Sequence, residues 1–468
     1  MPLRLRRMLP RRYVKDPQCN QSLSHSVRDG VAYSLMSGAG ETYFTAFALF
    51  LKATPTQVGL LAALPQLMAS VAQLFSAFLG RLTLHRKRII LWGAGIQAFS
   101  WIPIICIAIL VPEMSIYWFI GGVIIYFFGY NLAIPQWCSL MGDLVPERKR
   151  GRFFAVRTRI ASVTAFAALV AAGLILHFFE RQGMALVGFV SIFAIAVVGR
   201  FISIYHLTRM HDPPGHVAAL EMPLSKNFWR YFIHSPVARF SLFVACLQFA
   251  TYIASPFFAV YMLNDLKYSY FEYTLNIAAV ILAQSLTLYG WGRIGDAFGN
   301  RVILVITGII IPVLPLLWLI SSHFWFILLL QTLGGVFWAG FNLSASNYVY
   351  DLVPRDKRVT LLAVHNSLSN LGVFLGALAG GVLAVSLPQT ISINALDWHW
   401  HWLTPIYGLF LISAVLRLVM VGLFLPGLPE VRKNKSIKLK DLLRRVIGGH
   451  NARSLLLAWL PLLIKKRI

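Results

Sequence analysis

Long apolar stretches alternate with short polar ones along the whole chain. A helix needs about 20 mostly apolar residues to cross the ~30 Å hydrocarbon core of a bilayer. Twelve stretches have this length and character. The pattern therefore predicts twelve membrane-spanning helices, which we place at residues 30–51, 57–79, 89–111, 115–141, 153–178, 184–206, 238–263, 273–291, 302–321, 324–348, 360–386 and 403–425.

The longest internal polar gap separates the sixth span from the seventh and is rich in proline. It divides the spans into two groups of six. We therefore expect an all-α polytopic membrane protein in which a cytoplasmic linker, residues 207–237, joins an N-terminal six-helix bundle, residues 30–206, to a C-terminal one, residues 238–425. A basic cytoplasmic segment, residues 1–29, precedes the first bundle.

Residues 426–468 follow the last span and combine cations with apolar residues. The segment 437–447 reads IKLKDLLRRVI, which is an amphipathic pattern. The apolar run at 455–464 is too short to span a bilayer and contains a proline. We expect this tail to lie at the inner membrane surface, where anionic lipid attracts its cations.

The composition excludes most soluble classes. Of the 468 residues, 58% are hydrophobic and 13% are charged, against ~25% charged in a typical soluble protein. A soluble enzyme, a disordered chain and a disulfide scaffold are all excluded by this balance. The four cysteines form no CxxC pair, and no metal or cofactor motif stands out.

The formal net charge of +25 comes from 42 Lys and Arg against 17 Asp and Glu. In a membrane protein such an excess gathers in cytoplasmic loops rather than marking a nucleic-acid site. With both termini inside, the predicted external loops hold only Lys52, Arg181 and Lys267. We therefore expect no nucleic-acid partner and a multi-pass protein of a bacterial inner (plasma) membrane, with both termini cytoplasmic.

Two segments resemble each other at an offset of 208 residues. Residues 143–156 read DLVPERKRGRFFAV, and residues 351–364 read DLVPRDKRVTLLAV. Each follows the fourth span of its half. The match therefore indicates an internal repeat of six helices.

The loop between the second and third spans of each half carries another motif. Residues 292–301 read GRIGDAFGNR, and residues 80–88 read GRLTLHRKR, which keeps the glycine and the basic end but lacks the Asp. The first of these resembles the G-x-x-x-D-x-x-G-x-R loop of the major facilitator superfamily, and the segment after the fourth span also looks like that family's. The resemblance implies a secondary transporter whose two bundles rock around a substrate near mid-membrane.

The matched loops supply candidates for a cytoplasmic gate. Asp143 ends a helix, where the dipole is negative, and so needs a cation from the neighbouring loop, for which Arg81, Arg86, Lys87 and Arg88 are available. Simple anchoring of helix ends is the alternative. The gate candidates are Gly80, Arg81, Arg88, Asp143, Arg148, Arg150, Gly292, Asp296, Gly299, Arg301, Asp351 and Arg358.

Glu41 is the one acid deep inside a predicted span. It lies about 16 Å beyond Gly30 at 1.5 Å per residue, roughly halfway across the core. Ser34, Ser37 and Thr45 share its helical face. Because burial favours the neutral form of a carboxyl group, Glu41 is our candidate for proton coupling or substrate binding. A structural carboxylate bonded between helices is the alternative.

Other polar residues of the spans are candidates to line a cavity, although such residues also serve simply to join helices. They are Ser37, Thr45, Gln66, Gln73, Asn131, Gln136, Arg157, Arg159, Gln248, Tyr252, Trp338, Asn342 and His365. Arg157 is placed to contact an anionic substrate, to pair with an acid or to snorkel to the headgroups. We expect Arg200 and Arg417 to snorkel, and the evenly spaced Gly372, Gly376 and Gly380 to pack helices closely.

The leading functional hypothesis is a proton-coupled permease for a small neutral or anionic solute, without cofactor, metal or enzymatic activity, acting as a monomer in the bilayer. A lipid or amphiphile transporter and a non-transporting receptor or scaffold remain as alternatives. Within the resemblance, span 5 lacks the Gly-Pro signature of drug exporters, and the loops of sugar porters are absent. No phosphate-binding loop for ATP occurs.

Overall fold

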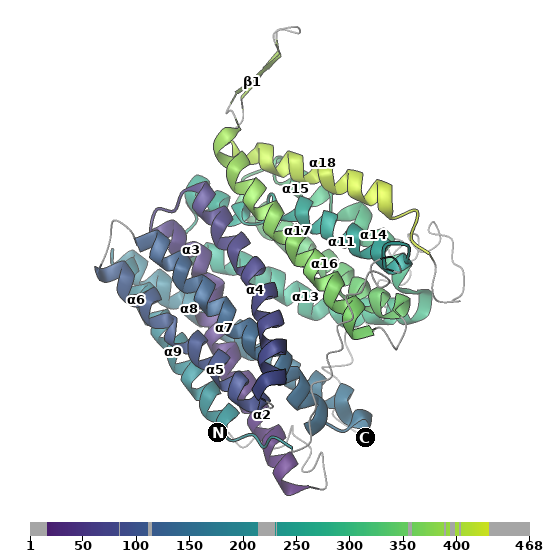
Figure 1. The fold of residues 1–468 in the computed structure, drawn as a ribbon. Coiled ribbons are helices and arrows are strands. Elements are labelled where there is room, and N and C mark those ends of the chain that lie inside the picture. Colours follow the sequence, from purple (N-terminus) through teal and green to yellow (C-terminus); the bar gives the residue numbers. More distant parts are fainter. Residues whose placement is uncertain are drawn as a thin grey trace, which may run out of the picture. The chain divides into compact units, whose positions relative to one another are not determined.

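The structure is a computed structural model that describes residues 16–83, 85–110, 115–213, 230, 232–353, 358–387, 390–393, 398–401 and 404–429. Its contacts define two compact units (Figure 1). Unit 1 comprises the described parts of Met1–Glu221 and Pro256–Thr274, and unit 2 those of Met222–Ser255 and Leu275–Ile468. The amphipathic tail, most of the linker and most of the basic N-terminal segment lie outside the described residues.

The first segment of unit 1 is a broken helix. Asp16 caps α2 (Pro17–Ala39) by accepting a hydrogen bond of 2.9 Å from the amide of Gln18, and Pro17 follows at the first helical position. After Gly40 come a 3₁₀ turn, η1 (Glu41–Tyr43), and the short α3 (Phe44–Phe50). A Cβ at Gly40 would collide with the side chains of Trp101 and Ala196, so glycine permits this close packing.

The remaining helices of unit 1 are long and apolar. They are α4 (Pro55–Thr83), α5 (Arg86–Phe99), α6 (Trp101–Leu110), α7 (Ser115–Leu144), α8 (Glu147–Arg181), α9 (Ala185–Thr208), α12 (Phe257–Val260) and the π-helical η3 (Tyr261–Asp265). Helix α13 (Tyr270–Phe298) begins in this unit.

Unit 2 contains the rest of α13, from Leu275 onward. It contains α11 (Pro236–Tyr252), α14 (Asn300–Ile310), α15 (Val313–Leu317), α16 (Phe324–Leu352), α17 (Arg358–Ser386) and α18 (Ile406–Phe424). Two short strands, β1 (Thr390–Ile393) and β2 (Trp398–His401), form an antiparallel hairpin in which Thr390 pairs with His401. The predicted loop before the last span therefore contains a pair of antiparallel strands.

Eleven helices among the described residues are long and apolar enough to cross a membrane. The twelfth predicted span, the first in the chain, is the segment made of α2, η1 and α3. It differs from the others because α2 is rich in polar residues and because the helix is broken after Gly40.

The same packing scheme occurs in both units. In unit 1, α2 packs on α8 and α9, and α5 packs on α7; in unit 2, α11 packs on α17 and α18, and α14 packs on α16. Small residues allow the tightest contacts. A Cβ at Gly38 would collide with the carbonyl of Ala165, and Cβ atoms at Gly372 and Gly376 would collide with the carbonyls of Ala245 and Phe249. The packing role predicted for Gly372 and Gly376 is confirmed.

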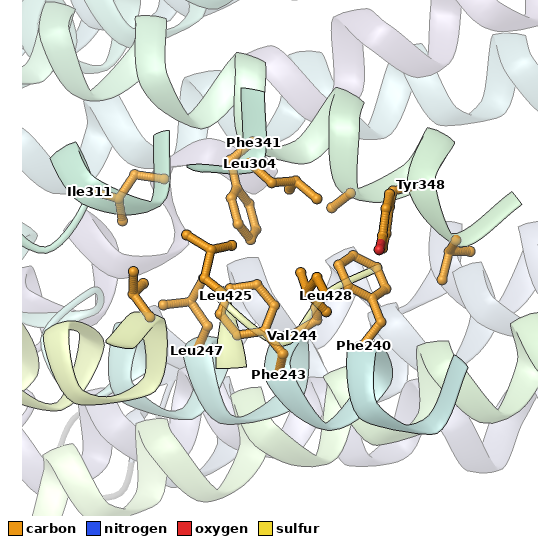
Figure 2. Close-up of a cluster of buried hydrophobic side chains, with 13 residues drawn as sticks. Phe240, Phe243, Val244, Leu247, Leu304, Ile311, Phe341, Tyr348, Leu425 and Leu428 are labelled. Atoms are coloured by element: carbon orange, nitrogen blue, oxygen red, sulfur yellow. The ribbon is translucent and has the colours of Figure 1, made fainter. Parts of the chain in front are cut away.

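A cluster of buried aromatic and aliphatic side chains lies in the core of unit 2 (Figure 2). Phe240 and Tyr348 meet edge to face with ring centroids 4.8 Å apart, and Phe243 contacts Phe341 at 6.3 Å. Tyr348 also donates a hydrogen bond of 2.6 Å from its hydroxyl to the carbonyl of Pro429. The cluster thus fixes the end of α18 against α11 and α16.

Candidate functional site

A cavity of about 190 Å³ lies among α2, α5, α7, α8 and α9, entirely within unit 1. Polar and aromatic side chains share its wall with aliphatic ones. The lining residues are Asp29, Tyr33, Ile90, Tyr130, Ala133, Ile134, Trp137, Cys138, Arg157, Arg200 and Leu207.

Arg157 connects α8 to α2 and α7. One of its terminal nitrogens lies 3.4 Å from a carboxylate oxygen of Asp29, and its Nε donates to the carbonyl of Ser26 at 3.2 Å. Its guanidinium lies 4.5 Å from the ring centroid of Trp137, within cation–π range. A Cβ at Gly30 would come within 3.1 Å of this guanidinium, so glycine leaves it room. Of the roles predicted for Arg157, pairing with an acid is the one observed.

Arg200 reaches the same acid through a hydroxyl. Its Nη1 donates to the Oγ of Ser203 at 2.8 Å, and that hydroxyl donates to Asp29 at 2.6 Å. The guanidinium also lies 5.4 Å from the ring centroid of Tyr33. Arg200 is only 4% exposed, so the prediction that it snorkels to the headgroups is wrong.

A row of tyrosine side chains connects Glu41 to this cavity. The hydroxyl of Tyr126, which is fully buried, donates to the Glu41 carboxylate at 2.8 Å. Tyr130 follows one turn later on α7 and stacks on Tyr33 with ring centroids 5.6 Å apart. Because residues four apart share one face of a helix, Tyr126 and Tyr130 connect the carboxylate to the cavity wall.

Several predicted cavity residues make contacts that join helices. Gln73 of α4 donates to the side-chain oxygen of Asn131 on α7 at 3.0 Å, and Gln136 donates to the carbonyl of Ser76 at 2.9 Å. In unit 2, His365 lies 3.0 Å from the hydroxyl of Ser241 and stacks on Phe240. Trp338 packs against the hydrophobic cluster of unit 2 drawn in Figure 2.

The other predicted residues stand apart from these contacts. Arg159 and Asn342 are exposed and do not line the cavity. The partly buried ones, also outside the cavity wall, are Ser37, Thr45, Gln66, Gln248 and Tyr252. Ser37 lies one turn before Glu41 and supplies a second hydroxyl to its carboxylate.

The predicted gate loops form ion pairs and hydrogen bonds inside each unit. Arg86, at the start of α5, is 3% exposed and binds Asp143 at 2.5 Å and Asp212 at 2.7 Å. In unit 2, Asn300 at the start of α14 donates to Asp351 at 2.9 Å. Of the four cations predicted for Asp143, Arg86 is thus the partner observed. The two contacts occupy matching places in the two halves.

The other predicted gate residues differ in their surroundings. Gly80 adjoins the amide of Gln136, and Gly299 has a φ of 91°, which favours glycine before α14. Arg88 and Asp296 are exposed, and Gly292 and Arg301 are partly buried. The side chains of Arg81, Arg148, Arg150 and Arg358 lie outside the described ones.

Asp29 is the functional candidate that sequence reasoning missed. It precedes the apolar run by one residue, so it was assigned to the cytoplasmic segment. The structure places it in α2, only 4% exposed. Its spacing of four residues before Tyr33, on the face of α2 that meets the cavity, was the available signal.

Among the described residues, no group of three or more His, Cys, Asp or Glu side chains is placed to hold a metal ion. The cavity and its surroundings present the carboxyl groups of Asp29 and Glu41, the guanidinium groups of Arg157 and Arg200, and aromatic walls.

The model of the Major Facilitator Superfamily matches residues 30–254 and again residues 240–467. The chain belongs to the major facilitator superfamily. The double match agrees with the internal repeat, and family membership indicates a membrane transporter rather than an enzyme.

Solved structures of this superfamily share the fold. The nucleoside transporter NupG is 15% identical, with a TM-score of 0.66 over 87% of this chain and 98% of its own. A D-xylose–proton symporter is 13% identical, with a TM-score of 0.64 over 90% of this chain and 99% of its own. At these identities the likeness shows the fold alone.

A curated relative matches a smaller part. The multidrug resistance protein MdtG of Salmonella choleraesuis (strain SC-B67) is 32% identical over 94 residues. That match covers 20% of this chain and 23% of the relative, so the chain is aligned to about a quarter of that relative's length.

Proposed function

We propose that this superfamily member is a proton-coupled secondary transporter that moves a small neutral or anionic organic solute by alternating access. The observation that carries the proposal is the contact between Glu41 and Tyr126, one helical turn from the wall of a cavity containing two arginines. A proton site and a solute site would then be adjacent in one bundle.

The surroundings of Glu41 support the coupling role. Its partners are hydroxyl groups, and none of the described ion pairs involves it. A carboxylate inside a membrane-spanning segment is costly in its charged form, and binding a proton relieves that cost. Loss and gain of the proton would alter the Tyr126 contact and hence the position of α7 at the cavity.

The proposal also includes the organisation inferred from the sequence. We propose six-helix bundles at residues 30–206 and 238–425, cytoplasmic termini, an inner-membrane location and a monomer. The positive-inside distribution of Lys and Arg supports this orientation.

The test uses purified protein in proteoliposomes with an imposed pH gradient and a panel of neutral and anionic solutes. We expect Glu41→Gln to abolish accumulation driven by the gradient while solute exchange without a gradient persists. The matched control is Glu272→Gln at the start of α13, where the side chain accepts from the backbone amide of Ser269 and lies away from the cavity. Undiminished proton-driven accumulation in Glu41→Gln would refute the coupling role.

A further inference from the structure

Two residues of the cavity wall in unit 1 have side-chain hydrogen-bond donors without a partner among the described residues. Arg200 is 4% exposed, and its Nε has no partner among the described residues. The buried Nε1 of Trp137, also in the cavity wall, has none among them either. Both nitrogen atoms are closed off from the cavity space in this structure, so a ligand would accept from them after small movements of the two side chains. A buried donor without a partner costs about 1–3 kcal/mol, and such a ligand would recover that cost.

The charge of the lining favours an anion. Arg157 and Arg200 carry two positive charges, and Asp29 is the one acid in the wall. Asp29 is already bound by Arg157 and by Ser203. One positive charge of the lining therefore remains without an opposite charge in that lining.

The volume of the cavity and its aromatic lining favour a ligand with a planar ring. A volume of about 190 Å³ exceeds the ~150 Å³ of an engineered protein cavity that takes up benzene. Tyr33, Tyr130 and Trp137 supply aromatic surfaces, against which a planar ring stacks well. The space thus suits one ring with one small charged group.

We propose that this cavity binds a small planar monocarboxylate, of about the size of benzoate, with its carboxylate accepting from Arg200 Nε and Trp137 Nε1. The inference names the substrate class of the proposed transporter and so rests on the proposed function. It differs from that proposal in placing the solute inside the helices of the first unit, between α2, α7 and α9.

Cys138 allows a binding test that is local to the cavity. It lines the cavity and is exposed, so its alkylation by N-ethylmaleimide can be followed by peptide mass spectrometry on the full-length purified protein. We expect benzoate to slow this alkylation at concentrations at least tenfold lower than benzamide, which lacks the charge, or cyclohexanecarboxylate, which lacks the flat ring. Alkylation of Cys246, which lies in unit 2, should not change.

Two further probes test whether the site instead binds any small anion or the headgroup of an anionic lipid. Inorganic phosphate tests for a plain anion site, and nanodiscs of phosphatidylglycerol, compared with phosphatidylcholine, test for a lipid headgroup. Protection by either at concentrations similar to benzoate, or no protection by benzoate, would overturn the inference.

Variants test the two donors without removing the bulk of either side chain. Arg200→Lys keeps the charge but removes Nε, and Trp137→Phe keeps an aromatic ring but removes Nε1. Each should raise the half-protecting concentration of benzoate by about tenfold, as expected for one lost hydrogen bond to a charged group. Arg159→Lys, an exposed arginine on the same helix as Arg157, is the matched control and should leave it unchanged. Unchanged protection in both cavity variants, with Cys246 alkylated as in the wild type, would refute the assigned donors.

Binding is measured by protection of Cys138, and transport is measured separately by uptake into proteoliposomes. Protection of Cys138 without uptake of benzoate into proteoliposomes would support the site and contradict its role in transport. Proton-driven uptake of another solute, equal in wild type and Arg200→Lys and without any protection by benzoate, would support transport and overturn the site.

Discussion

Arginines inside the helical units are held by backbone carbonyls and aromatic faces as well as by acids. Arg157 uses the carbonyl of Ser26 and the ring of Trp137 in addition to Asp29. Arg417, which is 2% exposed, donates to the carbonyls of Ile311 and Thr251 at 3.3 and 3.4 Å. The prediction that Arg417 snorkels is therefore wrong.

Proline explains why a guanidinium is needed at that point. In a continuous helix the carbonyl of Ile311 would accept from the amide of residue 315, but Pro315 has no N–H to give. The helix is interrupted there between α14 and α15. Arg417 supplies the missing donor from α18.

We predict that Arg417→Leu destabilises the protein by about 1–3 kcal/mol, because the carbonyl of Ile311 loses its donor in a buried place. Arg417→Lys should recover part of this loss, since an ammonium group also donates. Thermal unfolding of purified protein measures the effect. Arg159→Leu, at an exposed position, is the control and should change the melting temperature little. Equal melting temperatures for the two leucine variants would contradict the explanation.

Some site residues were predictable one at a time, but their partners were not. Glu41 and Arg157 were found because a charge inside an apolar run is conspicuous. Asp29 escaped because it lies just before the run, where charges are common. That Gln73 bonds Asn131 depends on α4 packing against α7. Such tertiary pairing is not encoded in the local pattern.

At the scale of elements, hydrophobic length was a good guide to where helices lie but not to where they break. The predicted span 30–51 treats Ser34, Ser37, Glu41 and Thr45 as one stripe on a straight helix. The structure instead places Glu41 in a 3₁₀ turn after Gly40. The break depends on the close approach of Trp101 and Ala196 to Gly40, a packing effect that periodicity does not report.

Glycines in similar helices should respond to substitution in opposite directions. Gly376 of α17 lies against the carbonyl of Phe249, whereas Gly422 of α18 has open space where a Cβ would be. Alanine is favoured over glycine in a helix by about 1 kcal/mol. We therefore predict that Gly422→Ala raises the melting temperature and that Gly376→Ala lowers it, because α11 and α17 must move apart. If both substitutions raised the melting temperature, α11 and α17 would be able to move apart at little cost in free energy, and the prediction for Gly376→Ala would be wrong.

At the scale of the whole molecule, the overall fold was the most predictable feature. Twelve apolar segments, a repeat at an offset of 208 residues and the loop motifs specified it. Its solved relatives share the fold at 13–15% identity, which indicates that the hydropathy pattern rather than particular side chains determines the architecture. In our proposal the substrate is determined by a few side chains inside unit 1, and composition carries no information about those.

The grouping of Pro256–Thr274 with unit 1 was not predictable from the sequence. These residues come from the second half of the chain but pack with the first. The hydroxyl of Tyr43 lies 2.9 Å from that of Thr274, and Tyr270 lies edge to face with Phe189 at 5.1 Å. The proposed topology places these contacts on the external side, so alternating access would require them to separate.

Gly173 provides a way to test that separation. A Cβ at Gly173 would collide with the side chain of Thr274, so Gly173→Leu should weaken this contact and favour an externally open state. We predict faster labelling of a cysteine introduced at Ser269, just before α13, by a membrane-impermeant maleimide on intact cells. Gly121→Leu is the matched control, because a Cβ at Gly121 of α7 meets open space. Labelling should rise severalfold in the first variant and not in the second, since only the first places atoms between α8 and α13. Equal labelling rates in the two variants would mean that this contact does not close the external side and that the halves separate elsewhere.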